Sequence, residues 1–186
     1  SYHSLSPANL DETYRTGTFH YGDGAAKLRE LIDALESTYC GSIGSEYMHI
    51  VDAREQLWVQ QRLESARGKP QFDAGQKQRI LERLIAAEGL EKYLHRRYPG
   101  TKRFGLEGGE SLIPMLHELF QRLGTHGIRE SVIAMAHRGR LNVLVNVLGK
   151  NPGDLFDEFD GRVLSESGSG DVKYHQGFSS NMMTPG

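Results

Sequence analysis

The chain has 186 residues, of which 38% are hydrophobic and 25% charged, and its formal net charge is −2. This composition is ordinary for a soluble protein, and the length allows one domain with a substantial core plus additional helices. The near-neutral charge excludes bulk attraction to nucleic acid or to an anionic membrane. No apolar run approaches the roughly 18 residues that a membrane span needs. We therefore expect neither nucleic acid nor membrane as a partner.

The single cysteine, Cys40, excludes an internal disulfide framework and argues against a structural zinc site. It fits a reducing compartment, which is the cytoplasm in a bacterium or the mitochondrial matrix in a eukaryote. The chain begins at Ser1 without an initiator Met, shows no signal-peptide layout, and stops at Gly186 without a closing element. We therefore expect it to be part of a larger protein.

The first hundred residues are predicted to be mainly helical. Residues 1 to about 23 contain several turn-forming residues with little periodicity, which predicts extended loop. Apolar residues then recur at helical spacing in three segments, two of which start with an Asp in capping-box position. These predicted helices run from Gly24 to about Thr38, from Asp52 to before Gly68, and from Asp73 to Pro99.

The remainder, residues 101–186, is predicted to begin an α/β domain. A helix is expected over residues 111–124, with a glycine at its end. The unbroken apolar run Val132 to Ala136 is typical of a strand buried on both faces, as in a parallel sheet. A helix should follow and end at Gly149, and a further short helix should be capped by Asp154.

His137 follows the predicted strand and is flanked by Arg138 and Arg140. Ligands of open α/β sheets bind where strands end and helices begin, so the imidazole could transfer a proton and the guanidinium groups could bind a carboxylate or phosphate. A hydrogen-bonded structural histidine and ordinary salt bridges are the alternatives, and the residues alone leave both open. Weaker candidates are His175 in a glycine-containing loop, and Gly108-Gly109, whose N–H groups could bind an anion.

Six short motifs occur in order along the chain. They are Glu46-Tyr47-Met48-His49-Ile50, Ala87-Glu88-Gly89-Leu90-Glu91, Leu106-Glu107-Gly108-Gly109-Glu110, Met135-Ala136-His137-Arg138-Gly139-Arg140-Leu141-Asn142-Val143-Leu144, Asp154-Leu155-Phe156-Asp157-Glu158-Phe159 and Gly170-Asp171-Val172-Lys173-Tyr174-His175. Together they resemble the thiamine-diphosphate-dependent decarboxylating component of 2-oxoglutarate dehydrogenase, from about Tyr39 onward. The resemblance implies the N-terminal part of such an enzyme. Residues 1–100 would be its helical lead-in, and residues 101–186 the start of its parallel-sheet, thiamine-diphosphate-binding domain of the pyrimidine-phosphate type.

The resemblance also implies an oxidoreductase of the tricarboxylic acid cycle. That family decarboxylates 2-oxoglutarate on thiamine diphosphate with Mg²⁺ and passes the succinyl group to the lipoyl group of a dihydrolipoyl succinyltransferase. It works as a homodimer with active sites at the subunit interface. The family's Gly-Asp-Gly motif and later Asn, which hold the metal and the diphosphate, are absent and would lie beyond Gly186. We therefore expect no metal ligand in this chain, which alone should neither bind the cofactor tightly nor turn over substrate.

Four site residues follow from the resemblance. His137 and His175 correspond to active-site histidines, and both are expected to be catalytic and to bind substrate. Phe104 is expected beside the same substrate pocket, and Ser179 near the cofactor or substrate, with His137 also near the cofactor. A dianionic substrate explains the need for imidazoles, and an apolar ring would keep the decarboxylation site dry.

Two alternatives to this function remain. A relative acting on 2-oxoadipate shares the His-Arg-Gly-Arg region, although Glu46-Tyr47-Met48-His49-Ile50 favours the oxoglutarate branch. A non-catalytic assembly module is the other alternative, because the helical lead-in could dock subunits and an aromatic residue such as Trp58 would suit an interface.

Overall fold

The computed structural model describes residues 5–162 and 175–185, and the chain divides into two compact units, residues 1–72 and 73–186. The described part is mostly helical, and its one sheet has two antiparallel strands. The predicted helical lead-in is thus confirmed, whereas the start of a parallel sheet is not seen among the described residues. Most of the sixth motif, from Gly170 to Tyr174, lies outside them.

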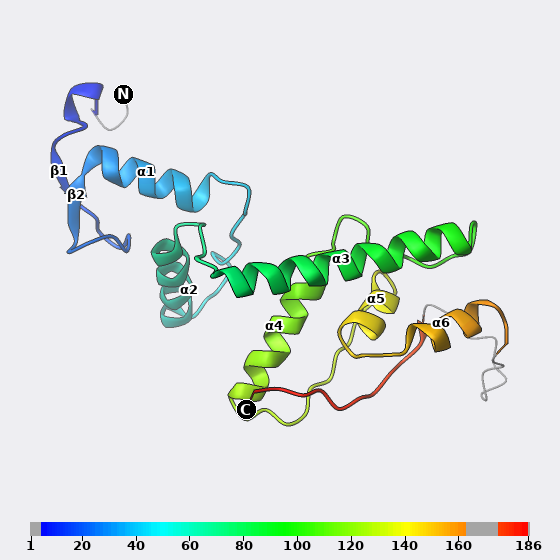
Figure 1. Cartoon of the computed structure of the whole chain (residues 1–186). Coiled ribbons are helices and arrows are strands. Elements are labelled where there is room, and N and C mark those ends of the chain that lie inside the picture. The colour runs from blue at the N-terminus through cyan, green and yellow to red at the C-terminus, as the bar shows by residue number, and fades with distance from the viewer. Residues whose placement is uncertain (1–4, 163–174, 186) are drawn as a thin grey trace. The chain divides into compact units, whose positions relative to one another are not determined.

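The first unit combines a small β-ribbon with two helices (Figure 1). Its elements are η1 (Pro7–Asn9), β1 (Thr13–Arg15), β2 (Ala25–Lys27), α1 (Leu28–Tyr39) and α2 (Ala53–Ala66). Tyr14 of β1 lies opposite Ala26 of β2. The prediction of loop up to residue 23 was therefore wrong in part. A strand of three residues is too short to show alternation, and it is fixed by its pairing partner.

Two helices start where the sequence predicts. The carboxylate of Asp52 accepts from the backbone N–H groups of Arg54 at 2.8 Å and Glu55 at 3.2 Å, which caps α2. Asp73 and Gln76 form a reciprocal capping box, with hydrogen bonds of 2.7 and 2.9 Å, at the start of α3 (Ala74–Arg97). Local side-chain chemistry thus fixes both helix starts.

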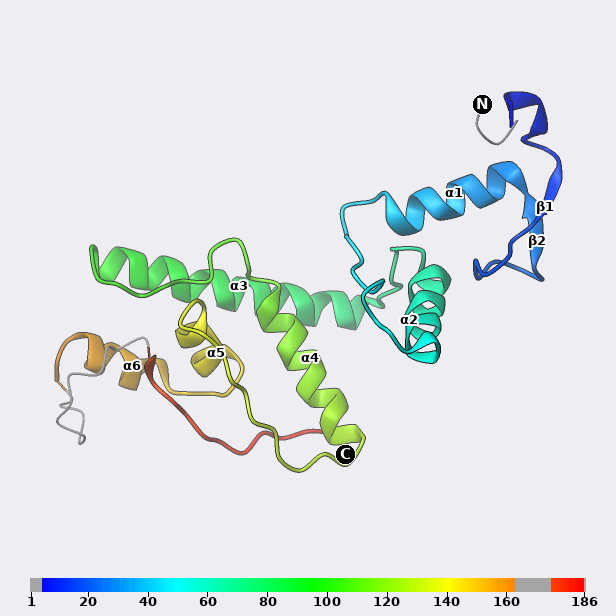
Figure 2. The ribbon, with the colours of Figure 1, turned by 180° about the vertical axis from the view of Figure 1, so that it is seen from behind.

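The second unit packs three shorter helices on α3. They are α4 (Leu112–Thr125), α5 (Arg140–Asn146) and α6 (Pro152–Phe159). In Figures 1 and 2, one end of α4 lies against α3 and the helix runs away from it, and α5 lies against α3 between α4 and α6. The sequence grouped α3 with the lead-in, but the contacts within the chain place it in this unit. The predicted cap of α6 is corrected: Asn151 accepts from Gly153 N–H at 2.8 Å, and Asp154 lies in the first turn.

Two apolar clusters form the core of this unit, and α3 and α5 contribute to both. The first contains Ala87, Leu106, Ile113, Val143 and Val147, and the second contains Leu90, Leu94, Leu141, Leu155 and Phe159. Because α5 lies between the two clusters, the residues just before it are anchored to a well-packed element.

The segment 132–136 is not the predicted strand buried on both faces. Ile133 and Met135 pack against the first cluster, whereas Val132 is 96% exposed and the side chains alternate between half-buried and exposed. This period of two marks an extended segment with one packed face. No described segment pairs with it, and a strand of a parallel sheet is defined by its ladder partners. Among the described residues, no helix has the length and apolar character to cross a membrane.

Candidate active site

Three rings from three separate segments come together in the second unit. The ring centroids of Phe104 and His137 are 4.0 Å apart with an interplanar angle of 48°. The centroids of His137 and His175 are 6.0 Å apart, with an angle of 32°. The structure therefore brings together three of the four site residues expected from the sequence.

A tight turn places His137 at the start of α5. Gly139 has a φ of 73° and caps the helix, and its N–H donates to the carbonyl of Phe104 at 2.8 Å. A Cβ added to Gly139 would lie 2.5 Å from Cδ1 of Leu106, in a backbone conformation that side chains rarely adopt. The turn thus favours glycine at this position of the His-Arg-Gly-Arg motif, because the φ is positive and because a side chain here would lie too close to Leu106.

Phe104 is itself in a left-handed conformation, with a φ of 43°. For a residue with a large side chain this conformation costs on the order of 1–3 kcal/mol and persists only where neighbouring contacts impose it. Here the carbonyl of Phe104 accepts from Gly139, and its neighbour Arg103 forms ion pairs with Glu91 and Glu107. The strained backbone therefore presents the Phe104 ring to His137.

A buried polar network supports this arrangement. Glu91 on α3 is 5% exposed, and its Oε1 accepts from Leu106 N–H at 2.9 Å and from Asn142 Nδ2 at 3.0 Å. Asn142, fully buried on α5, also donates to the carbonyl of Ala87 at 2.9 Å, and its Oδ1 accepts from Asn146 at 2.7 Å. One carboxylate thus connects α3, α5 and the loop that carries Phe104.

These supporting residues were not predicted as part of a site, although the sequence contains a signal for two of them. Glu91 shares the buried face of α3 with Ala87, Leu90 and Leu94, at helical spacing. Asn142 interrupts an apolar run on α5. A polar residue on an otherwise apolar face indicates a buried hydrogen-bonded group.

The two arginines beside His137 contact backbone carbonyls. Arg140 donates from Nη1 to the carbonyl of His175 at 3.0 Å, and from Nη2 to the carbonyl of Met135. Nη1 of Arg138 lies 3.4 Å from the carbonyl of Gly105. Within residues 5–162 and 175–185, neither arginine forms an ion pair. Arg140 therefore connects the segments that carry the two histidines.

The segment after His175 is held by a buried lysine. Lys150 is 9% exposed, and its Nζ donates to Oε1 of Glu158 at 2.8 Å and to Oε1 of Gln176 at 2.6 Å. Further along, Ser180 donates to the carbonyl of Leu148 at 2.6 Å. Ser179 is exposed, and no hydrogen bond joins it to either histidine in the described part of the chain.

The glycine pair before α4 does not present free N–H groups to an anion. Gly108 N–H donates to Oε1 of Glu110 at 3.0 Å, and Gly109 N–H donates to the carbonyl of Leu106 at 2.8 Å. Both donors are therefore used within the loop.

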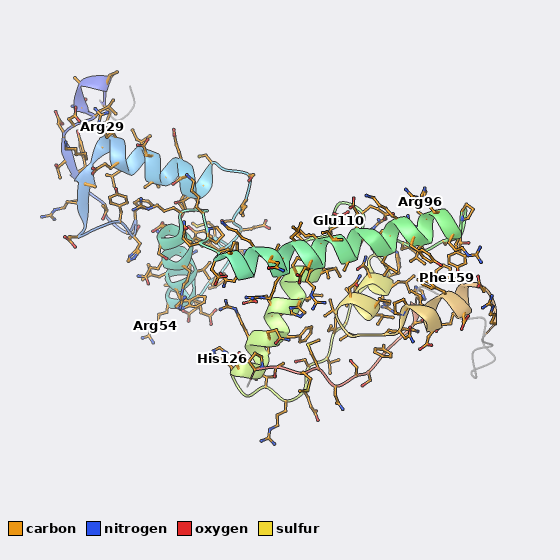
Figure 3. All side chains as sticks on the ribbon, in the orientation of Figure 1. Arg29, Arg54, Arg96, Glu110, His126 and Phe159 are labelled. Atoms are coloured by element: carbon orange, nitrogen blue, oxygen red, sulfur yellow. The ribbon has the colours of Figure 1, made fainter. Side chains whose placement is uncertain are left out.

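A separate hollow of about 360 Å³ lies along α3, lined by Glu88, Glu91, Lys92, His95, Arg96, Glu107 and Glu110. Arg96 and Glu110, labelled in Figure 3, come from α3 and from the loop before α4. Burial favours a higher pKa for Glu107, but hydrogen bonds from its own backbone and from Arg103 outweigh burial, so its pKa lies below the usual value. Of the residues that line the hollow, Glu88 pairs with Lys92, whereas Glu91 and Glu107 pair with Arg103, which does not line it. In the described ranges, no group of three or more His, Cys, Asp or Glu could hold a metal ion.

Similar sequences of known proteins cover the whole chain. A 2-oxoglutarate dehydrogenase E1 component of Azotobacter vinelandii is 61% identical over 186 residues, which is 100% of this chain and 20% of that protein. One from Cupriavidus necator is 51% identical over the same 186 residues, and one from Haemophilus influenzae is 47% identical over 180 residues. No family model matches the chain.

The chain spans about one fifth of the length of these curated relatives. Identity of 61% along all 186 residues, a range that contains His137 and Phe104, is far above what chance similarity gives. By its sequence, the chain belongs to the family of 2-oxoglutarate dehydrogenase E1 components.

Proposed function

We propose that this chain supplies the substrate-facing side of an active site that decarboxylates 2-oxoglutarate. The observation that carries the proposal is the contact of Phe104, His137 and His175, which arrive from three segments of one unit. The relatives' shared name supports the substrate. We infer that the helices of the second unit cover the start of a parallel-sheet domain.

Thiamine diphosphate and Mg²⁺ are the cofactors that this reaction requires. The described residues fit the substrate end of such a site, because they bring together two imidazoles and an apolar ring but no cluster of metal-ligating groups. We therefore assign the diphosphate and metal ligands to parts of the relatives that this chain does not match. When bound, thiamine supplies the electron sink for decarboxylation.

The chain's own residues have three tasks in this proposal. The imidazoles of His137 and His175 donate hydrogen bonds to the carboxylates of the dianionic substrate, because an imidazole is a compact donor that can also carry a positive charge. The same imidazoles then stabilise charge that develops as carbon dioxide leaves. The ring of Phe104 excludes water from the reacting carboxylate, which favours loss of its charge. Ser179, exposed in this chain, would contact substrate or cofactor in the assembled site.

The wider role that we propose is that of the 2-oxoglutarate dehydrogenase E1 family. We propose a homodimer that passes the succinyl group to a lipoyl group of dihydrolipoyl succinyltransferase, in the bacterial cytoplasm as an oxidoreductase of central metabolism. The bacterial origin of the relatives supports the compartment.

The test replaces each histidine by alanine in the complete gene product that contains this chain. We expect His137→Ala and His175→Ala each to lower kcat/KM for 2-oxoglutarate by more than about tenfold, equivalent to about 1.4 kcal/mol of transition-state stabilisation. His126→Ala is the matched control, since His126 is exposed at the end of α4 (Figure 3). Full activity of both site variants would refute the proposal, and a higher kcat/KM for 2-oxoadipate than for 2-oxoglutarate would correct the substrate.

A further inference from the structure

Two cations hold the segment that carries His175, one at the backbone of that residue and one at its neighbour. We infer that Arg140 and Lys150 are positioning residues that set the separation of His137 and His175. The inference rests on the proposed function of the two histidines. It adds two residues whose effect on the reaction passes through His175.

Arg140 is suited to this task because its own position is fixed. It is the first residue of α5, its N–H donates to the carbonyl of His137 at 3.1 Å, and the next residue, Leu141, is buried in the second cluster. Its guanidinium reaches the carbonyl of Met135, two residues before His137, and the carbonyl of His175. A guanidinium is planar with donors at fixed spacing, so the two carbonyls are held in a defined relation.

Lys150 holds the same segment through the residue after His175. Its ammonium group joins Gln176, the residue after His175, to Glu158 of α6. Two neighbours of Glu158 on α6, Leu155 and Phe159, are buried in the second cluster beside Leu141. Because the Lys150 side chain is only 10% exposed, solvent screens this ion pair weakly. Arg140 therefore connects the backbone of His175 to α5, and Lys150 connects the side chain of the next residue, Gln176, to α6.

This arrangement predicts a specific pattern of coupling. If Arg140 acts mainly by holding His175, most of the effect of its replacement should be lost when the imidazole of residue 175 is absent. A contact that merely stabilises the fold would instead lower activity equally with or without that imidazole. A double-mutant cycle measures this difference.

The experiment uses the complete gene product and compares Arg140→Gln, His175→Ala and the double variant. We expect Arg140→Gln to lower kcat for 2-oxoglutarate by about tenfold or more, with a smaller change in KM. In the His175→Ala background, the same replacement should change kcat by less than about threefold. Arg140→Lys should retain intermediate activity, because an ammonium group cannot donate to both carbonyls with the planar geometry of a guanidinium.

Lys150→Gln should show the same non-additivity with His175→Ala. If Arg140→Gln does not fold, Lys150→Gln and Arg140→Lys take its place in the double-mutant cycle. The matched controls are Arg122→Gln and Lys92→Gln, which remove exposed ion pairs on α4 and α3 and should leave kcat unchanged. Equal losses of activity in both backgrounds, or unchanged activity of the Arg140 and Lys150 variants, would overturn this inference but leave the proposed function standing. Unchanged activity of His175→Ala would instead overturn the proposed function, and with it this inference.

Discussion

Asn142 donates a hydrogen bond to Oε1 of Glu91 at 3.0 Å, and both side chains are buried. The other carboxylate oxygen of Glu91 pairs with Arg103, the residue before Phe104. The candidate site is therefore built on a buried charge rather than on apolar packing alone. A buried carboxylate is tolerated only when it is paired and fully hydrogen-bonded, and Glu91 meets both conditions.

Glu91→Gln is expected to destabilise the second unit. The replacement removes the negative charge that compensates Arg103, whose side chain is 14% exposed, and it weakens the hydrogen bond from Asn142. Loss of one member of a buried pair costs about 3 kcal/mol or more. Hydrogen exchange in peptides from α3 and α5 of the complete gene product measures the change in local opening free energy.

The control for this prediction is Glu88→Gln. Glu88 forms an exposed i,i+4 pair with Lys92 on the same helix, and such pairs contribute less than about 1 kcal/mol. Equal protection of α3 in the two variants would show that Glu91 has no special structural role.

How far the sequence predicts this site depends on the range of the interactions involved. The helix starts at Asp52 and Asp73 were predicted correctly, because a cap is decided by residues three positions apart. Residues 132–136 were predicted as a strand buried on both faces, but ladder partners are not encoded in the segment itself. Local patterns gave no reason to bring His137 and His175 together, and only the family resemblance placed both in one site, because a long-range contact such as that of Arg140 with the carbonyl of His175 has no local signal.

Gly139→Ala is expected to disrupt the turn that presents His137. The positive φ disfavours alanine by about 1–2 kcal/mol, and its methyl group would overlap Leu106. We expect the hydrogen bond from residue 139 to Phe104 to break and kcat/KM to fall by tenfold or more, which is about 1.4 kcal/mol. Steady-state kinetics and the thermal midpoint of the complete gene product provide the two measurements.

Gly89→Ala is the informative comparison for that variant. Gly89 lies inside α3, and a Cβ there would meet open space. Alanine is favoured over glycine in a helix interior by about 0.5–1 kcal/mol, so this variant should be slightly more stable with unchanged activity. Unchanged activity and stability of Gly139→Ala would contradict the requirement for glycine in the turn.

The first unit should lose stability at alkaline pH through Tyr39. Burial and hydrogen bonds with Tyr47 and Glu64 raise the pKa of the Tyr39 phenol above its usual value near 10. Its hydroxyl donates to the buried carboxylate of Glu64 at 2.7 Å, which favours the neutral phenol. Because the folded-state pKa is raised, the contribution is fully present below the unfolded pKa and is lost as pH rises above about 10.

Hydrogen exchange in α1 and α2 at a series of alkaline pH values tests this prediction, after correction for the intrinsic exchange rate. Tyr39→Phe should remove most of the added pH dependence, although it should also be less stable at neutral pH because Glu64 loses a donor. Tyr14→Phe is the control, since Tyr14 pairs with the exposed Glu12 in the β-ribbon. The same alkaline loss in the Tyr39→Phe variant would assign the dependence to other groups.

The isolated chain of 186 residues is expected to bind thiamine diphosphate and Mg²⁺ weakly. Mg²⁺ binds through hard oxygen ligands and bridges them to phosphate oxygens, and no metal-binding cluster occurs in the described part of the chain. The imidazoles and the Phe104 ring contact the substrate end of the proposed site, so they contribute little affinity for a diphosphate. Calorimetric titration of the folded chain, verified by its helical circular dichroism, should show no binding in the micromolar range. Micromolar affinity of the isolated chain would place cofactor ligands within these residues and would overturn the assignment of the diphosphate and metal ligands to other parts of the relatives.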